Sequence, residues 1–168
     1  SDYEGHKSTP EQSHRNVFRL DPETGELWQA TTEFTQPNGL AFSQDEKLLY
    51  VAESGSSHDD SVPSVIRVYD VDANNMLENG RVFTTIDKGI PDGFRVDCHG
   101  NVWSSAADGV HCFDAGGELL GKILVPETVS NLSFGGPDPM RCLFLAQKPG
   151  DPNSRTGLKS RRNEIRTS

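Results

Sequence analysis

Short apolar runs separated by polar turns follow one another along this chain, and one arrangement of them occurs three times. Each copy has a polar residue, a short apolar segment, a turn and a second apolar segment, and the copies lie at residues 37–52, 91–105 and 130–146. Runs rich in Val, Ile, Leu, Phe and Tyr that are bounded by Gly, Pro, Asn and Asp are typical of β-strands. Long helical periodicity is absent from the sequence. Each copy therefore predicts a pair of antiparallel strands, and the chain is predicted to be all-β.

A second pattern, an apolar segment that ends in an aspartate, repeats out of phase with the first. The aspartates are Asp21, Asp70 and Asp114, at spacings of 49 and 44 residues. This period is typical of β-propeller blades, which are four-stranded antiparallel sheets packed face to face around a channel. We expect Trp103 and Phe134 to pack between blades. The repeats provide three to four blades, too few to close a ring, so we expect an incomplete six-bladed propeller and a chain that is part of a longer protein.

Charge divides the sequence into two regions. The net charge is −9, but residues 148–168 hold six Lys or Arg against two Asp or Glu, so residues 1–147 hold ten basic and 23 acidic residues, a net charge of −13. We interpret residues 1–147 as the partial propeller and residues 148–168 as a basic, irregular C-terminal tail. An acidic body disfavours nucleic acid as a partner and suits a cation-binding site.

Cysteine content and hydropathy give little indication of where the protein acts. Cys98, Cys112 and Cys142 are widely spaced and contain no Cys-x-x-Cys grouping, so we expect neither a disulfide framework nor a zinc site, and predict that they are buried small residues on strands. No apolar run approaches membrane-spanning length, and no membrane partner is expected. The polar start of the sequence does not resemble a signal peptide. Localisation is left open, with both cytoplasm and periplasm compatible.

The candidate chemistry lies at the start of the repeated strand pairs. In a propeller the first strand of a blade begins at one mouth of the channel, and Asn38 and Asp92 hold this position in two copies, with Asn131 in the third. An amide oxygen and a carboxylate that converge on one point suit a hard cation such as Ca²⁺ or Mg²⁺, and Mn²⁺ or Zn²⁺ is also compatible. The alternative is that Asn-Gly and Asp-Gly serve only as turn dipeptides.

Several motifs taken together strongly resemble the SMP-30/gluconolactonase/regucalcin-like family over residues 1 to about 146. The motifs are Ser1–Lys7, Asn16–Pro22, Pro37–Ser43, Pro91–Gly93, Gly100–Trp103, Asp108–Val110 and Asn131–Gly136. The resemblance implies a six-bladed propeller that hydrolyses sugar lactones with one divalent cation, most readily Ca²⁺, at the channel mouth. In that family the Asn of Pro-Asn-Gly and the Asp of Pro-Asp-Gly are metal ligands, and they match Asn38 and Asp92. The implied partner is a small sugar lactone.

The mechanism that the resemblance implies gives Asp92 two roles. Water attacks a lactone carbonyl polarised by the cation, and Asp92 is both a metal ligand and the carboxylate that accepts the water proton. In that family a glutamate near the N-terminus completes the metal site. Glu4 and Glu11 do not match the setting of that glutamate, so neither is assigned to it.

Weaker candidates and other functions remain open. His6 is a candidate substrate contact or proton shuttle at the channel mouth, with a surface role as the alternative, and Asn131 is a candidate substrate-binding residue. A serine-hydrolase site at Ser54 is disfavoured because Glu53-Ser54-Gly55-Ser56 lacks the second glycine of a nucleophile elbow. The alternative functions are a related lactone or ester hydrolase, a non-enzymatic calcium-binding propeller module, and a chain that is inactive by itself.

Overall fold

The structure, a computed structural model, describes residues 15–135 together with the backbone of residues 142–147 and 157–160. Apart from one 3₁₀ turn, η1 (Gly55–Ser57), the elements in these ranges are strands. The strands are β1 (Val17–Leu20), β2 (Leu27–Thr31), β3 (Pro37–Phe42), β4 (Leu48–Glu53), β5 (Val65–Val71), β6 (Leu77–Thr85), β7 (Phe94–Val96), β8 (Val102–Ala106), β9 (Gly109–Phe113), β10 (Leu119–Leu124), β11 (Thr128–Phe134), β12 (Cys142–Gln147) and β13 (Gly157–Ser160).

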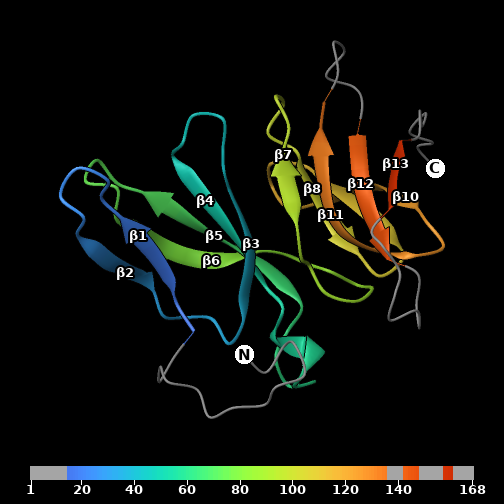
Figure 1. Ribbon diagram of the computed structural model, residues 1–168, viewed down its shortest axis with the longest axis horizontal. Coiled ribbons are helices and arrows are strands. Elements are labelled where there is room, and N and C mark those ends of the chain that lie inside the picture. Colours follow the sequence, from blue (N-terminus) through green and yellow to red (C-terminus); the bar gives the residue numbers. More distant parts are fainter. Residues whose placement is uncertain (1–14, 136–141, 148–156, 161–168) are drawn as a thin grey trace.

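The strands form four antiparallel sheets, and within each sheet consecutive strands of the chain are neighbours (Figure 1). Two sheets have four strands each, β3-β4-β5-β6 and β7-β8-β9-β10, while β11-β12-β13 has three and β1-β2 has two. Every strand pair is antiparallel. This arrangement confirms the prediction of an all-β, incomplete propeller built from blade-like sheets.

Burial within each complete sheet follows the order of the strands. β4 and β9 are central strands and are buried almost throughout, which explains their nearly continuous apolar sequences. The fourth strands, β6 and β10, are more exposed, and of the residues in both strands only Thr84 of β6 is buried. Each sheet is therefore buried on its inner strands and solvated at its outer edge.

The core lies between the sheets. One apolar cluster joins Tyr50 and Ile66 of the β3–β6 sheet to Phe94 and Phe113 of the β7–β10 sheet. Further clusters join β1–β2 to the other face of the β3–β6 sheet, and the β7–β10 sheet to β11. The burial of these side chains is the main force that holds neighbouring sheets together.

The predicted aromatic pair, Trp103 and Phe134, packs between the β7–β10 sheet and β11. The rings of Trp103 and Phe134 meet edge to face, with centroids 6.0 Å apart, a geometry that aromatic pairs favour. The prediction that these two side chains pack between blades is confirmed.

The first strands of the three largest sheets lie side by side. The backbone N–H of Gly39 donates to the carbonyl oxygen of Asp92 at 3.1 Å, and the N–H of Gly93 donates to the carbonyl oxygen of Ser130 at 2.8 Å. A Cβ atom added at Gly39 would lie 2.1 Å from the Asp92 carbonyl oxygen, and one added at Gly93 would lie 2.2 Å from Asn131 Oδ1. Glycine is required at both positions because no side chain fits between the strands.

The structure corrects two expectations about individual strands. Asn131 lies in the middle of β11, which begins three residues earlier, at Thr128, and not at Asn131. Asp70 lies within β5 and pairs with Arg81 at 2.9 Å. The aspartate that caps the β5–β6 turn is Asp72, which accepts the backbone N–H of Asn74 at 2.8 Å.

Two further expectations also differ from the structure. Cys98 is exposed, not buried, because it lies in the β7–β8 turn beyond the last residue of β7. Cys112 on β9 is buried as predicted, and the side chain of Cys142 lies outside the described residues. Within the segment expected to be an irregular tail, Gly157–Ser160 forms β13, which pairs with β12.

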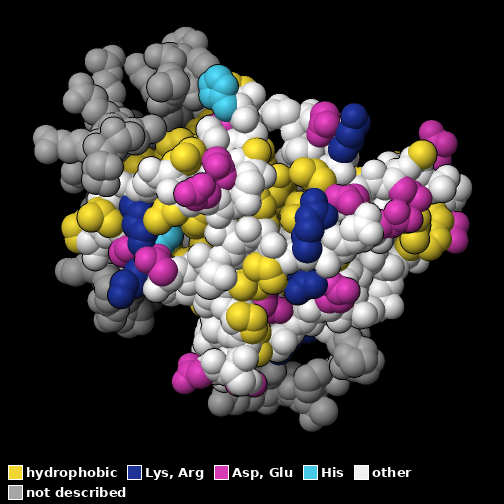
Figure 2. Space-filling view, turned by 180° about the vertical axis from the view of Figure 1, so that it is seen from behind, with side chains coloured by type: hydrophobic (Ala, Val, Ile, Leu, Met, Phe, Trp, Pro, Cys, Tyr) yellow, Lys and Arg dark blue, Asp and Glu magenta, His cyan; other side chains and the backbone are white. Residues whose placement is uncertain are grey.

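Several large apolar side chains remain exposed among the described residues. They include Phe18, Leu20, Leu27, Leu40, Phe42 and Leu124. Figure 2 shows apolar patches on one face, interspersed with acidic and basic side chains. None of the described residues forms a helix with the length and apolarity needed to cross a bilayer.

Candidate active site

Asn38 and Asp92 are brought together at the meeting point of β3 and β7. Asn38 is the second residue of β3, and Asp92 lies two residues before β7 begins. Both are partly buried, and the Asn38 side chain hydrogen-bonds to the Asp92 carboxyl group. Burial raises the pKa of Asp92 above its ordinary value, and the hydrogen bond from Asn38 offsets only part of this effect.

The backbone around Asp92 is fixed by bonds from two sheets. The Asp92 N–H donates to Ser105 Oγ at 3.2 Å, and the Ser105 N–H donates to the carbonyl oxygen of Gly93 at 3.0 Å. From the neighbouring sheet, Ser54 Oγ donates to the carbonyl oxygen of Pro91 at 2.6 Å. The residues on both sides of Asp92 are thus held by partners on β8 and at the end of β4.

Asn131 lies on the other side of the same segment, against Gly93. Its Oδ1 accepts the backbone N–H of Leu132 at 2.8 Å, and the residue is partly buried. The first strands therefore place Asn38, Asp92 and Asn131 in one neighbourhood. His6, like Glu4 and Glu11, lies outside the described residues.

The sequence reasoning missed the carboxylate of Glu53 at the end of β4. Glu53 is buried and accepts backbone N–H groups of Thr35 at 2.7 Å, Gln36 at 2.8 Å and Gly55 at 2.7 Å. Three such bonds satisfy a buried carboxylate and fix the segments before β3 and after β4. The only indication of Glu53 in the sequence is that an acidic residue follows a continuous apolar run. An exposed acidic residue in a turn would produce the same pattern.

Only part of a cation site is present among the described residues. They contain no group of three or more His, Cys, Asp or Glu side chains arranged to hold a metal ion. The Asn38 amide oxygen and the Asp92 carboxylate are hard ligands, and the two side chains are close enough to hydrogen-bond to each other. These two residues fit a divalent cation chemically, and they would supply two of the six to eight oxygen ligands that Ca²⁺ takes.

A buried histidine lies near the outer side of the β7–β10 sheet. His111 Nε2 lies 2.6 Å from Asp108 Oδ1, and its Nδ1 lies 3.6 Å from Asp87 Oδ1. Lys122 donates to both Asp87 oxygens, at 2.7 and 2.8 Å. The two carboxylates face different ring nitrogens of His111, and Lys122 already binds Asp87, so this group is an ion-pair network and not a shared metal site.

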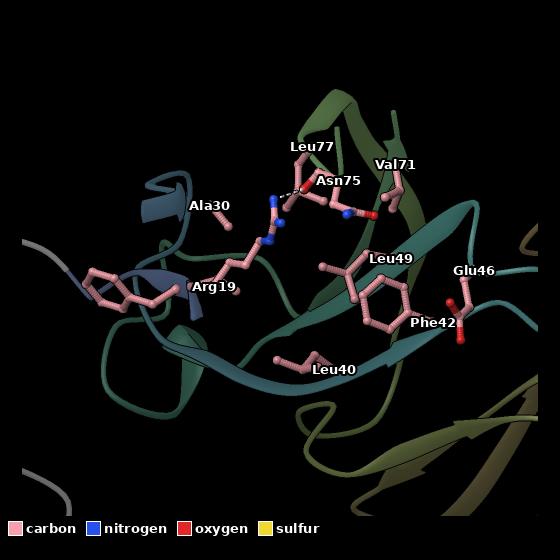
Figure 3. Close-up of a pocket in the computed structure, with 11 residues that line it drawn as sticks. Arg19, Ala30, Leu40, Phe42, Glu46, Leu49, Val71, Asn75 and Leu77 are labelled. Carbon is pink, nitrogen blue, oxygen red and sulfur yellow. Dashed lines mark hydrogen bonds between the residues drawn. The ribbon is translucent and has the colours of Figure 1, made fainter. Parts of the chain in front are cut away.

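A separate cavity of about 300 Å³ lies between β1–β2 and the β3–β6 sheet (Figure 3). Its walls are mainly apolar and include Phe18, Leu40, Phe42, Leu49 and Val71. Arg19 lies at its side and donates to the carbonyl oxygen of Asn74 at 2.9 Å. Neither Asn38 nor Asp92 lines this cavity, so it is not part of the candidate active site.

Comparison with known proteins adds the family. A family model described as "SMP-30/Gluconolactonase/LRE-like region" matches residues 3–147. The chain belongs to this family. Among curated relatives, a gluconolactonase of Zymomonas mobilis is 36% identical over 135 residues, which cover 74% of this chain and 36% of that protein. The pentonolactonase XacC of Haloferax volcanii is 32% identical over 146 residues, which cover 84% of this chain and 47% of that protein.

Solved structures of other proteins show the same fold. A gluconolactonase of Xanthomonas campestris matches with a TM-score of 0.72 and 38% identity, over 83% of this chain and 44% of that protein. A calcium-binding protein, regucalcin, of Agrobacterium tumefaciens matches with a TM-score of 0.68 and 22% identity, over 85% of this chain and 50% of that protein. The second likeness shows the fold alone. The chain thus spans half or less of the length of these relatives.

Proposed function

We propose that the protein to which this chain belongs hydrolyses sugar lactones. The observation that carries the proposal is the contact between Asn38 and Asp92, where burial raises the pKa of the carboxyl group. A carboxylate held in a partly buried site between the first strands of adjacent blades is placed to act on a small molecule at the channel mouth. The gluconolactonase and pentonolactonase relatives support a lactone as substrate.

Asn38 and Asp92 are the proposed cation ligands from this chain. A bound divalent cation, most readily Ca²⁺, with Mg²⁺, Mn²⁺ and Zn²⁺ as alternatives, would polarise the lactone carbonyl and stabilise the charge that develops on its oxygen. In this structure the partner of the Asp92 carboxyl group is the neutral side chain of Asn38. A bound cation would be a charged partner in its place.

Asp92 is the proposed proton acceptor. In the proposed reaction, a water molecule adds to the lactone carbonyl carbon while one of its protons passes to the Asp92 carboxylate; the ring C–O bond then breaks, and Asp92 returns the proton to the departing ring oxygen to give a hydroxy acid. Asn131 is proposed to contact the substrate from the next blade.

A second candidate function is calcium binding without turnover. It would need the same oxygen ligands, Asn38 and Asp92, but no proton acceptor. A related lactone or ester hydrolase on the same scaffold would use the same groups with another substrate. Turnover separates the binding module from both hydrolases, because a binding module needs oxygen ligands but no proton acceptor.

The test is the variant Asp92→Ala in the full-length protein, with Asp45→Ala as the matched control. Asp45 lies in the β3–β4 turn, at the opposite end of β3 from Asn38, and its side chain is 61% exposed. We expect Asp92→Ala to lower kcat for gluconolactone by about 10²–10⁴-fold, the range for loss of a general base, and to weaken Ca²⁺ binding measured by calorimetry. Asp45→Ala should leave both unchanged. Retained turnover and unchanged cation affinity in Asp92→Ala would refute the assignment.

A further inference from the structure

The segment that carries Asp92 has no strand partner of its own at that residue. β6 ends at Thr85 and β7 begins at Phe94, so Asp92 lies in the connection between two sheets. Its carbonyl oxygen is held by the Gly39 N–H of the neighbouring sheet. Its N–H is held by a side chain, Ser105 Oγ. The orientation of the carboxyl group therefore depends on contacts other than a regular strand ladder.

Two serine hydroxyls make the side-chain contacts to this segment, one from each adjoining sheet. Ser105, near the end of β8, accepts the Asp92 N–H, and Ser54, directly after β4, donates to the carbonyl oxygen of Pro91. Both serines have an exposed fraction of 0%. A buried hydroxyl is costly unless it is hydrogen-bonded, so each one fixes its backbone partner at a defined distance.

The neighbouring sequence indicates that the hydroxyls are there for these bonds. Ser105 is followed by Ala106, and Ser54 comes soon after Val51 and Ala52, all buried against the apolar clusters. Alanine would fit such surroundings without a polar group to satisfy. Full burial and the bond to Pro91 also leave Ser54 with no access to a substrate, which removes it as a nucleophile.

We propose that Ser54 and Ser105 are positioning residues that hold the Asp92 carboxyl group against Asn38. The proposal rests on the proposed function for its catalytic consequence, but the positioning itself is a property of the fold. Without the Ser105 hydroxyl, the Asp92 N–H loses its partner and the residue turns toward solvent. A small displacement of a reacting group costs a large part of its catalytic effect.

The chain contains a matched control, Ser104. It is the neighbour of Ser105 on β8, its exposed fraction is also 0%, and its hydroxyl donates to the carbonyl oxygen of Ser105 at 3.1 Å. Ser104→Ala therefore removes the same atoms from an equally buried position without breaking a bond to residues 91–93.

The experiment compares Ser54→Ala, Ser105→Ala and Ser104→Ala in the full-length protein. We expect Ser105→Ala to lower kcat for gluconolactone by about 10–100-fold with KM changed by less than about twofold, and Ser54→Ala to act in the same direction. In NMR hydrogen-exchange measurements, the Asp92 N–H should exchange about tenfold faster in Ser105→Ala than in wild type, because it has lost its acceptor Ser105 Oγ, and Ser54→Ala should act in the same direction. Ser104→Ala should lower the melting temperature by a similar amount and leave kcat and the exchange rate of the Asp92 N–H unchanged.

The two readouts separate this inference from the proposed function. If the wild-type protein does not hydrolyse lactones, the proposed function fails, and the exchange rate of the Asp92 N–H still decides the positioning role. If the Asp92 N–H exchanges at the same rate in wild type, Ser105→Ala and Ser104→Ala, and any loss of kcat is equal in the two variants, the two serines serve stability alone and the inference is overturned.

Discussion

At the scale of single residues, Asp92 is held in a state that favours its protonated form. Burial raises the pKa of its carboxyl group despite the hydrogen bond from Asn38. A raised pKa in the folded state means that the folded chain binds the proton more tightly than the unfolded chain. Stability is therefore lost as the pH rises from below the unfolded pKa, about 3.9, through the folded pKa. Such a cost is common where a residue serves a function and not the fold.

We predict that Asp92→Asn stabilises the protein at pH 7 when divalent cations are chelated. The amide has the shape of the carboxyl group without its charge, and the expected gain in the free energy of unfolding is on the order of 0.5 kcal/mol for a half-exposed group. Urea unfolding at pH 7 and near pH 4 measures it. The gain should shrink near pH 4, where a larger fraction of the wild-type carboxyl is protonated. If Asp92→Asn is less stable than wild type at pH 7, this account of the Asp92 environment is contradicted.

At the scale of elements, the close approach of the first strands is what brings the site together. Gly39 and Gly93 let β3, β7 and β11 come near enough for backbone hydrogen bonds between sheets. The sequence was enough to predict that Asn38 and Asp92 hold matching places in the repeat, because this follows from the period alone. The partners of Asp92, Ser54 and Ser105, could not be predicted in this way, because their contacts depend on how one sheet sits against the next.

We predict that Gly93→Ala destabilises the protein by about 2 kcal/mol or more and weakens turnover. The added methyl group would lie 2.2 Å from Asn131 Oδ1 and 2.9 Å from its Cα, so backbone must move. Gly121→Ala, on β10, is the matched control, since a Cβ there meets nothing within 4 Å. Chemical unfolding should show Gly121→Ala at or slightly above wild-type stability. Equal stability of the two variants would mean that β7 and β11 are further apart than described.

The β7–β8 hairpin depends on Asp97 in a way that predicts pH dependence. Burial alone would raise the pKa of Asp97. Hydrogen bonds to its carboxylate have the larger, opposite effect, so the net shift of the pKa is downward. The donors are Trp103 Nε1 at 2.9 Å, the Asn101 side chain and the backbone N–H groups of Asn101 and His99. A lowered folded pKa stabilises the fold above the unfolded value, about 3.9, and this contribution is lost as the pH falls through the folded pKa.

We predict that Asp97→Asn lowers the free energy of unfolding at pH 7 by about 2 kcal/mol, the usual cost of losing hydrogen bonds to a charged group. The control is Asp114→Asn. Asp114 accepts two backbone N–H groups in the β9–β10 turn and has no side-chain donor in the described structure, so a smaller loss is expected. The difference between wild type and Asp97→Asn should narrow below pH 4. A difference that is independent of pH would show that the charge of Asp97 contributes nothing.

At the scale of the whole molecule, the repeat predicted the sheets but not the precise equivalence of their residues. Asp21 and Asp114 cap the turns that follow β1 and β9, whereas Asp72 and not Asp70 does so after β5. β5 and β9 are the third strands of the two four-stranded sheets. β1 shares with them the apolar segment followed by an aspartate, so β1 and β2 correspond to the third and fourth strands of a blade. The apolar cavity lies beside them, over Leu40 and Phe42 of β3 (Figure 3).

We predict that the isolated 168-residue chain self-associates and has no lactonase activity. Leu40 and Phe42 are 50% and 48% exposed beside the cavity, and apolar surface of this kind drives association. Phe42→Gln should reduce the association measured by light scattering at increasing concentration. Leu124→Gln is the control, since Leu124 is 71% exposed but does not line the cavity, and its effect should be small. A monodisperse monomer that turns over gluconolactone would contradict this prediction.

A crystal structure of the full-length protein with bound Ca²⁺ decides whether Asn38 and Asp92 share a cation. We predict one cation 2.3–2.6 Å from both the Asn38 amide oxygen and an Asp92 carboxylate oxygen, the distances usual for calcium ligands, with the hydrogen bond between the two side chains replaced. A cation bound elsewhere, with Asn38 still hydrogen-bonded to Asp92, would contradict the claim that these two residues form the cation site of a lactone hydrolase.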